Sequence, residues 1–267
     1  MITIYTNQKV KKIVSYIQKN KARREDNVFI VEGMKMLVEV PKKNVREIYI
    51  SDSFSKNKKN EQDMQYIKLI GASVEIVSDD VFKRMADTQT PQGVMAVVSQ
   101  YHYELSDIVV KKDGREPLIL ILENIQDPGN LGTMLRSSEG AGVSGIIMSK
   151  DTADIYNPKV VRSTMGSVFR VPFIYVESLS DTINLLKKKG VTTYAAHLKG
   201  KHNYDEADYV GPTAFLIGNE GKGLTKETAD SADEYILIPM LGMVESMNAA
   251  TSAALLSFEA ARQRRNS

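Results

Sequence analysis

The sequence predicts an α/β protein with a mostly parallel sheet in its C-terminal part and a smaller α/β sandwich domain before it. Residues 118–122 form a continuous apolar run, which is typical of a parallel strand buried on both faces. After this run, apolar strands and helical stretches alternate, as they do in parallel sheets with helices on both faces. Residues 101–116, which precede the first apolar run, are poor in apolar residues. We therefore predict a domain at residues 1–105, a linker at 106–116 and a second domain at 117–267.

Composition restricts the class of protein. The chain has 267 residues, of which 42% are hydrophobic and 25% charged, as in soluble globular proteins. No apolar run approaches the roughly 18 residues that cross a bilayer, and the first residues lack the plan of a signal peptide. With no cysteine and three histidines, neither a disulfide framework nor a cysteine metal site is expected. We expect a cytoplasmic protein with no bound metal and no membrane partner.

The first part of the chain alternates short strands with helices. An exposed basic helix is expected over residues 9–24. It is followed by a strand that ends at a glycine turn, Gly33, and then by a helix over 34–40. Further strands are expected at 46–51, 74–77 and 94–98, with a helix at 64–70. This spacing predicts the small α/β sandwich.

The basic residues are concentrated in the first predicted helix. Between Lys9 and Arg24 the chain carries seven basic residues and no acidic one, although its formal net charge is only +2. Such a run is usually a solvated helix face. A surface that binds phosphates is the other interpretation. A later polar segment, residues 154–167, adds Lys159 and Arg162 along a predicted helix.

The second part contains the strands of the parallel sheet. They are expected at 118–122, 145–148, 171–176, 192–196, 214–217 and 235–238. Pro239 lacks the backbone donor that a further ladder bond needs, so the last strand ends there or lies at an edge. The small and apolar residues Ala249, Ala253, Leu256 and Ala260 then recur on one face of a C-terminal helix.

Polar, glycine-containing loops follow three of these strands. They read Asp127-Pro-x-Asn130-x-Gly132…Arg136, Gly218-Asn-Glu220-Gly-x-Gly223 and Ile238-Pro-Met240…Ser246-x-Asn248. Glycine-rich loops after strands often bind phosphates. However, Gly223 follows Lys222 where a P-loop needs Ser or Thr, and no G-x-G-x-x-G follows residues 118–122. The spacing therefore argues against both a P-loop and a dinucleotide-binding loop.

Together, the three loops resemble the motifs of the SpoU family of RNA ribose 2′-O-methyltransferases, a class of knotted enzymes. The resemblance covers nearly the whole chain. Phe29-x-x-Glu32-Gly33 and Thr90-Pro91-Gln92-Gly93-x-x-Ala96 are similar to the substrate-binding domain of many SpoU proteins. That domain in turn resembles ribosomal-protein L30e-like domains. The resemblance therefore implies a trefoil knot in the C-terminal domain and an N-terminal domain that binds structured RNA.

The resemblance also implies an activity. It implies an enzyme that transfers a methyl group from S-adenosylmethionine to a ribose 2′-hydroxyl, and a homodimer formed through the C-terminal domain. Ribosomal RNA (23S) is the favoured substrate, because many family members that act on transfer RNA lack the N-terminal domain. Transfer RNA methylation is the first alternative, and a non-enzymatic RNA-binding factor with the same fold is the second.

The same resemblance assigns the site residues. The implied catalytic residues are Asn130, Arg136, Glu220, Ser246 and Asn248. The implied cofactor-binding residues are Leu216, Gly218, Gly223, Ile238, Met240 and Met247, with Gly218 expected to let the backbone approach the adenine. The implied RNA-binding residues are Arg23, Arg24, Lys159 and Arg162, and no metal ligand is implied.

The resemblance leaves the role of Arg136 open, and this chain departs from the family pattern in the third motif. The family gives Arg136 either a base role or a phosphate-orienting role. A guanidinium stays protonated at neutral pH because its pKa is very high, which favours phosphate binding over a base role. The third motif usually reads Ser-Leu-Asn-Val-Ser, whereas this chain has Ser246-Met-Asn-Ala-Ala250. Met247 conserves volume in an apolar slot. Ala250 lacks the hydroxyl, so it receives no catalytic role.

Overall fold

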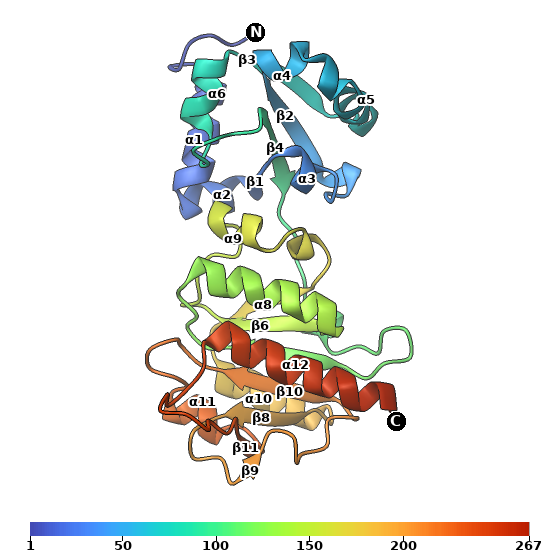
Figure 1. Cartoon of the computed structure of the whole chain (residues 1–267), viewed down its shortest axis with the longest axis vertical. Helices are drawn as coiled ribbons and strands as arrows, with labels where there is room; N and C mark the ends of the chain where they lie inside the picture. The colour runs from blue at the N-terminus through green and yellow to red at the C-terminus, as the bar shows by residue number, and fades with distance from the viewer. Residues whose placement is uncertain (267) are drawn as a thin grey trace. The chain divides into compact units, whose positions relative to one another are not determined.

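The computed structural model describes residues 1–266 (Figure 1). The chain divides into two compact units. Unit 1 contains Met1–Tyr101 together with Asp154–Phe169, and unit 2 contains His102–Ala153 and the chain from Arg170 onward. The predicted α/β class with a large parallel sheet is confirmed. The predicted domain limits, which assumed contiguous segments, do not anticipate that residues 154–169 cluster with the first unit.

Unit 1 is built on a four-stranded sheet of order β1-β4-β2-β3. The strands are β1 (Val28–Glu32), β2 (Val45–Ser51), β3 (Ser73–Val77) and β4 (Val94–Ser99). Strand β4 pairs antiparallel with β1 and β2, while β2 pairs parallel with β3. The larger helices are α1 (Gln8–Gln18), α2 (Asn20–Asp26), α5 (Glu61–Ile70) and α6 (Asp79–Met85). Short helical segments are α3 (Met34–Leu37), α4 (Asp52–Lys56), α9 (Pro158–Ser163), η1 (Lys42–Asn44), η2 (Lys58–Asn60) and η3 (Ser167–Phe169).

The predicted basic helix over residues 9–24 is two helices. Lys19 adopts an extended conformation, with φ −123° and ψ 115°, and separates α1 from α2. The break allows α1 to bury Val10, Ile13 and Tyr16 in the core against the sheet and α6. Most of the basic side chains remain exposed, but α2 turns Arg23 into the interior of the unit, where its residue exposure is 3%.

Unit 2 contains a seven-stranded sheet of order β7-β6-β5-β10-β8-β11-β9, and all of its neighbouring pairs are parallel. The strands are β5 (Leu118–Leu122), β6 (Gly145–Ser149), β7 (Phe173–Val176), β8 (Thr192–Ala196), β9 (His202–Asn203), β10 (Thr213–Ile217) and β11 (Glu234–Leu237). The helices are α7 (Leu105–Ile108), α8 (Pro128–Ala141), α10 (Leu179–Lys188), α11 (Lys226–Asp230) and α12 (Ala249–Asn266).

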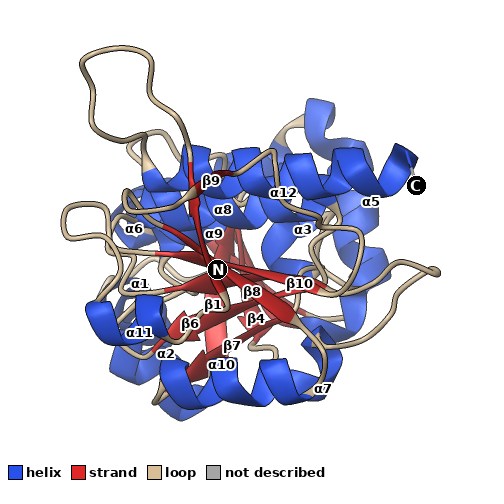
Figure 2. Cartoon of the chain, turned by 90° about the horizontal axis from the view of Figure 1, so that it is seen from below, coloured by secondary structure: helices blue, strands red, loops and turns tan. Residues whose placement is uncertain are grey.

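Helices cover both faces of this sheet. Helices α8 and α12 pack against each other on one side, and α10 lies on the other (Figure 2). On the α10 side, Ile183 and Leu186 join a buried cluster with Ile119, Ile121 and Leu216. The expected linker is partly packed in this unit, because Ile108 of α7 is fully buried in the same cluster.

Candidate functional site

The three predicted motif loops follow the carboxyl ends of β5, β10 and β11. Strands β5 and β10 are adjacent in the sheet, and β8 separates β10 from β11. Ligands of parallel α/β sheets bind in the crevice outside these strand ends. The topology therefore brings loops separated by about a hundred residues to one edge of the sheet, as hydrogen bonds between residues such as Asn124 and Asn219 record.

The loop after β10 is held by its own backbone. Asn219 and Gly223 exchange backbone hydrogen bonds of 3.1 and 2.9 Å. The Asn219 side chain accepts from the backbone N–H groups of Gly221 and Lys222, both at 3.0 Å. A Cβ placed on Gly218 would lie only 2.1 Å from the carbonyl carbon of Gly223 and from the nitrogen of Leu224. Gly218 is thus required for the loop to close on itself, a role that the motif alone does not indicate.

Glu220 lies at the centre of a set of donors from the first motif. Its carboxylate accepts hydrogen bonds from the backbone nitrogens of Gln126 (3.1 Å) and Asp127 (3.0 Å) and from Nδ2 of Asn130 (3.1 Å). Burial raises the pKa of Glu220, but these hydrogen bonds favour the charged form more strongly, so the net pKa lies below its ordinary value of 4.5. Glu220 is therefore an ionised acceptor at neutral pH.

Asn130 connects Glu220 to the third motif. While its Nδ2 donates to Glu220, its Oδ1 accepts from Nδ2 of Asn248 at 3.0 Å. The other end of Asn248, Oδ1, accepts from the backbone nitrogens of Ala250 (2.8 Å) and Thr251 (3.2 Å) and caps α12. The helix end therefore fixes which way each amide points. A single line of hydrogen bonds runs from α12 through both asparagines to the Glu220 carboxylate.

A cavity of about 340 Å³ lies beside this line. It is lined by the end of β8 (Ala196, His197, Leu198), the β10 loop from Ile217 to Leu224, the segment after β11 (Leu237, Ile238, Met240, Glu245, Ser246, Met247) and α12 (Ala249, Ser252). Its volume falls within the range of about 300–1,000 Å³ found for small-molecule sites. Backbone groups of a glycine loop beside methionine and aliphatic side chains suit a nucleoside joined to a thioether-like chain.

Most predicted cofactor residues meet at this cavity. Gly218, Gly223, Ile238, Met240 and Met247 line it, as do the predicted catalytic residues Glu220 and Ser246. Leu216 does not, because its side chain is fully buried in the cluster beneath α10. His197 and Leu198 line the cavity but were not predicted. Applying the strand-end rule to β8 as well would have indicated them.

The remaining predicted residues lie away from the cavity lining. Arg136 is exposed on α8, and its side chain forms neither a hydrogen bond nor an ion pair with any residue in 1–266. Arg24 and Lys159 are exposed, and Arg162 is paired with Asp87 at 2.6 Å. Arg23 is buried against Asp154, so its guanidinium is not available to RNA, and we do not keep it among the RNA contacts.

Nowhere in residues 1–266 do three or more histidine, aspartate or glutamate side chains gather in a group that could bind a metal ion. Of the helices in the same range, none has the length and apolar character that a membrane span requires.

Comparison with known proteins finds relatives for both parts of the chain. Residues 117–258 match the SpoU rRNA Methylase family, and residues 7–96 match the MRM3-like substrate binding domain. The chain is 31% identical over 254 residues to the 23S rRNA (guanosine(2553)-2′-O)-methyltransferase RlmP of Bacillus subtilis, covering 94% of this chain and 95% of that protein.

Two solved structures with bound AdoMet are similar as well. The rRNA methyltransferase from Sinorhizobium meliloti has 32% identity and a TM-score of 0.84, with 98% of this chain and 97% of that one covered. The SpoU methyltransferase AviRb from Streptomyces viridochromogenes has 25% identity and a TM-score of 0.87, with 97% and 98% covered. Fold and site thus define an RNA methyltransferase that uses S-adenosylmethionine. The chain belongs to the SpoU rRNA Methylase family.

Proposed function

We propose that the protein transfers the methyl group of S-adenosylmethionine to a ribose 2′-hydroxyl of ribosomal RNA, within 23S rRNA. The observation that carries this proposal is the line from Asn248 through Asn130 to Glu220 beside the cavity. It unites all three motifs at one place. The Bacillus subtilis relative is named as a methyltransferase for a 23S guanosine, and the N-terminal match to a substrate-binding domain favours a large structured RNA.

The cavity would hold S-adenosylmethionine, which when bound supplies a methyl group already activated for transfer. The backbone of Gly218 and Gly223 offers donors and acceptors for the adenine and ribose, while Ile238, Met240 and Met247 provide apolar surface. These residues satisfy the requirements of a mostly apolar site with a few fixed polar groups.

The protein's own part in the reaction is then chiefly orientation. Glu220 is ionised, and its carboxylate already accepts four hydrogen bonds, three from the first motif region and one from Nδ2 of Asn219, so its role is to hold Asn130 and the first-motif loop. Ser246 is exposed at the cavity and can hydrogen-bond the acceptor ribose. Arg136 is exposed and can bind the phosphate next to that ribose, because its planar fork matches phosphate oxygens.

The RNA surface is proposed to include Arg24, Lys159 and Arg162 of unit 1. Arg24 and Lys159 are exposed, and Arg162 is partly exposed although paired with Asp87. Exposed cations supply the salt-dependent part of RNA affinity by neutralising phosphates. We also propose that this unit resembles L30e-like ribosomal-protein domains. That resemblance would give the unit the task of binding folded RNA.

Family membership supports three further proposals. The C-terminal domain carries a trefoil knot, the protein works in the cytoplasm where ribosomal RNA is modified, and it forms a homodimer through unit 2. The homodimer proposal is supported by apolar side chains that are exposed in unit 2. In the segment after β11, the apolar residues Leu241 and Met243 are completely exposed, at 101% and 103% of their reference areas. Contiguous exposed apolar residues of this kind mark interaction sites.

The test uses labelled S-adenosylmethionine with 23S rRNA, transfer RNA and 16S rRNA taken from a strain without the gene. We expect label in 23S rRNA alone, at one ribose that resists alkaline cleavage. Label in transfer RNA alone would support the transfer-RNA alternative instead. Tight binding of S-adenosylmethionine and RNA without any transfer would support the non-enzymatic alternative and overturn the proposal.

A further inference from the structure

A segment of the catalytic sequence belongs structurally to the RNA-binding unit. Residues 154–169 connect β6 to β7 and lie inside the range 117–258 that matches the methylase family. They nevertheless cluster with Met1–Tyr101 in unit 1, where α9 packs against β1. Something in unit 1 must therefore hold a segment whose two ends continue into strands of unit 2.

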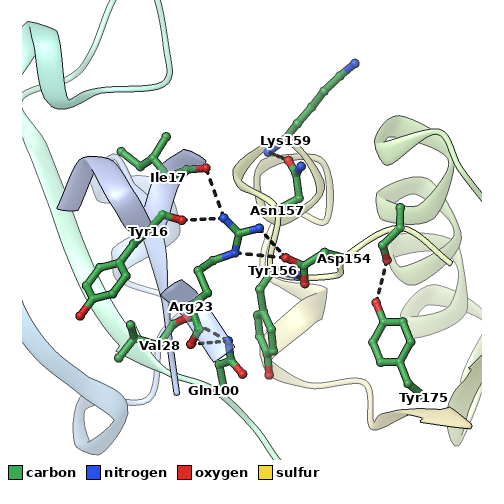
Figure 3. Close-up of polar contacts among 11 residues, drawn as sticks. Tyr16, Ile17, Arg23, Val28, Gln100, Asp154, Tyr156, Asn157, Lys159 and Tyr175 are labelled. Atoms are coloured by element: carbon green, nitrogen blue, oxygen red, sulfur yellow. Dashed lines mark hydrogen bonds and ion pairs between the residues drawn. The ribbon is translucent and has the colours of Figure 1, made fainter. Parts of the chain in front are cut away.

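The strongest attachment is the buried ion pair between Arg23 and Asp154 (Figure 3). Nη2 and Nε of Arg23 donate to the same carboxylate oxygen of Asp154, at 2.5 and 3.1 Å. Nη1 donates to the backbone carbonyls of Tyr16 (2.6 Å) and Ile17 (3.2 Å) at the end of α1. The two side chains are only 4% and 15% exposed.

This arrangement specifies one position for Asp154. All three guanidinium nitrogens are used, and the second oxygen of Asp154 accepts from the backbone nitrogen of Tyr156 at 3.1 Å. Lysine has no planar fork and could not make this set of bonds. Removal of either partner would leave a buried charge without compensation, which is far more harmful than loss of an exposed pair.

Two further side chains, those of Tyr156 and Arg162, hold the segment along its length. The hydroxyl of Tyr156 accepts from the backbone nitrogen of Tyr101 at 2.7 Å, and its ring lies 4.5 Å from that of Phe29. At the other end of α9, Arg162 pairs with Asp87. The backbone nitrogen of Asp87 donates to Glu32 at 3.3 Å, so α9 is held beside the Glu32–Gly33 turn of the substrate-binding domain.

The start of the segment is fixed separately within unit 2. Ala153, the residue before Asp154, donates from its backbone nitrogen to the backbone oxygen of Ile125 at 2.8 Å. Its backbone oxygen accepts from the hydroxyl of Tyr175 at 2.7 Å, and Figure 3 shows this contact of Tyr175. Neither bond involves Arg23. Release of Asp154 from Arg23 should therefore loosen residues 154–169 while leaving the sheet edge and the cofactor cavity in place.

We propose that Arg23 and Asp154 are a positioning pair for RNA: they hold residues 154–169 on unit 1, so that exposed Lys159 has a fixed place on the RNA-binding surface. This inference rests on the proposed function. A fixed cation binds a phosphate with less loss of conformational freedom than a mobile one, so the pair acts on capture of RNA. It acts neither on S-adenosylmethionine binding nor on transfer from the bound state.

The test compares Asp154→Asn with Glu25→Gln in the full-length protein. Glu25 lies on the same helix as Arg23, and its ion pair with Lys21 is exposed, so Glu25→Gln is the matched control. We expect Asp154→Asn to raise the KM for RNA by about 10-fold or more, with kcat at saturating RNA within about twofold of wild type. The Kd for S-adenosylmethionine should not change, and amide hydrogen exchange should rise in residues 154–169 alone.

Tyr156→Phe provides a second route, because it removes the hydroxyl contacts to Tyr101 without leaving a charge unpaired. This variant should also raise the KM for RNA, by a smaller factor than Asp154→Asn. If Asp154→Asn does not fold, Tyr156→Phe tests the positioning role. An unchanged KM in a folded variant with increased exchange would overturn the proposal, as would a fall in kcat at unchanged KM. Lack of transfer by the wild type would instead count against the proposed function, and exchange and RNA affinity would still test the positioning role.

Discussion

Asn248 donates a hydrogen bond from its side-chain Nδ2 to Oδ1 of Asn130, at 3.0 Å, across 118 residues of sequence. The direction of this bond is determined by α12, whose first backbone nitrogens occupy Oδ1 of Asn248. Asn130 must therefore present its own Nδ2 to Glu220. A helix cap, which alone would be a stability device, thus sets the orientation of an amide in the proposed active site.

Asn130→Asp tests this line. The substitution replaces the donor to Glu220 with a carboxylate oxygen, so that two like charges would lie about 3 Å apart. We expect the rate of methyl transfer to fall by about 100-fold, because the loops of all three motifs lose their common orientation. Single-turnover assays with labelled S-adenosylmethionine measure the rate. Ser137→Ala on the same helix is the control, and similar rates for both variants would contradict the role given to Asn130.

Gly218 and Gly221 provide a matched pair within one loop. A Cβ on Gly218 would lie 2.1 Å from backbone atoms of Gly223 and Leu224, whereas one on Gly221 would meet only Asn219 Oδ1 at 3.7 Å. Gly218→Ala should therefore lower the Tm and abolish binding of S-adenosylmethionine, while Gly221→Ala should change neither by much. Calorimetry measures both quantities. Normal binding by Gly218→Ala would refute the backbone explanation.

The lowered pKa of Glu220 predicts how the stability of the protein depends on pH. Because its folded-state pKa is below its ordinary value of 4.5, its carboxylate contributes stability above that value and loses the contribution as pH falls through the folded-state pKa. Glu220→Gln should therefore be less stable than wild type at pH 7, and the difference should shrink below pH about 4. Urea unfolding at the two pH values measures it. A difference that stays constant with pH would show that Glu220 does not act through its charge.

The sequence allowed prediction of what depends on local pattern. Strand β5 was recognisable because all five of its residues are apolar, and the structure buries all five. Asp127 and Pro128 were predicted only as part of a loop before a helix, whereas they are the N-cap and the first residue of α8. The association of residues 154–169 with unit 1 was not predictable in this way. It depends on Arg23 meeting Asp154 across 131 residues. In the sequence, Arg23 is indistinguishable from its exposed basic neighbours.

The structural role of Gly218 in closing its own loop was not predicted, for a related reason. Glycine in a motif after a strand indicates close approach of something to the backbone. It does not say whether that partner is a cofactor, the loop's own backbone, which lies 2.1 Å from a Cβ at Gly218, or both. Likewise, His197 has no motif around it, and its place at the cavity follows only from the position of β8 between β10 and β11.

The exposed apolar segment after β11 predicts the oligomeric state. We expect wild-type protein to scatter light as twice the mass of the 29.7 kDa chain. Met243→Asp places a charge on a completely exposed apolar side chain, and it should give a monomer because burial of an unpaired charge opposes association. Val110→Asp, at a residue 45% exposed elsewhere in unit 2, is the control and should leave the mass unchanged. A monomeric wild type at micromolar concentration would refute the dimer.

We expect a substitution of Arg136 to affect methyl transfer and not the binding of S-adenosylmethionine. It is exposed on α8, six residues after Asn130 and thus about 9 Å further along the helix axis, and it does not line the cavity. Arg136→Ala should therefore leave the Kd for S-adenosylmethionine nearly unchanged. Transfer should fall by roughly 100- to 1000-fold, as is typical when a positioned charge is removed from a transition state. Arg136→Lys keeps the charge but loses the planar fork, so it should recover only part of the rate. Calorimetry and single-turnover methylation on the same preparations measure the two quantities. A near wild-type rate for Arg136→Ala would place the transfer centre elsewhere, because no other proposed catalytic residue carries a positive charge that could orient the phosphate beside the target ribose.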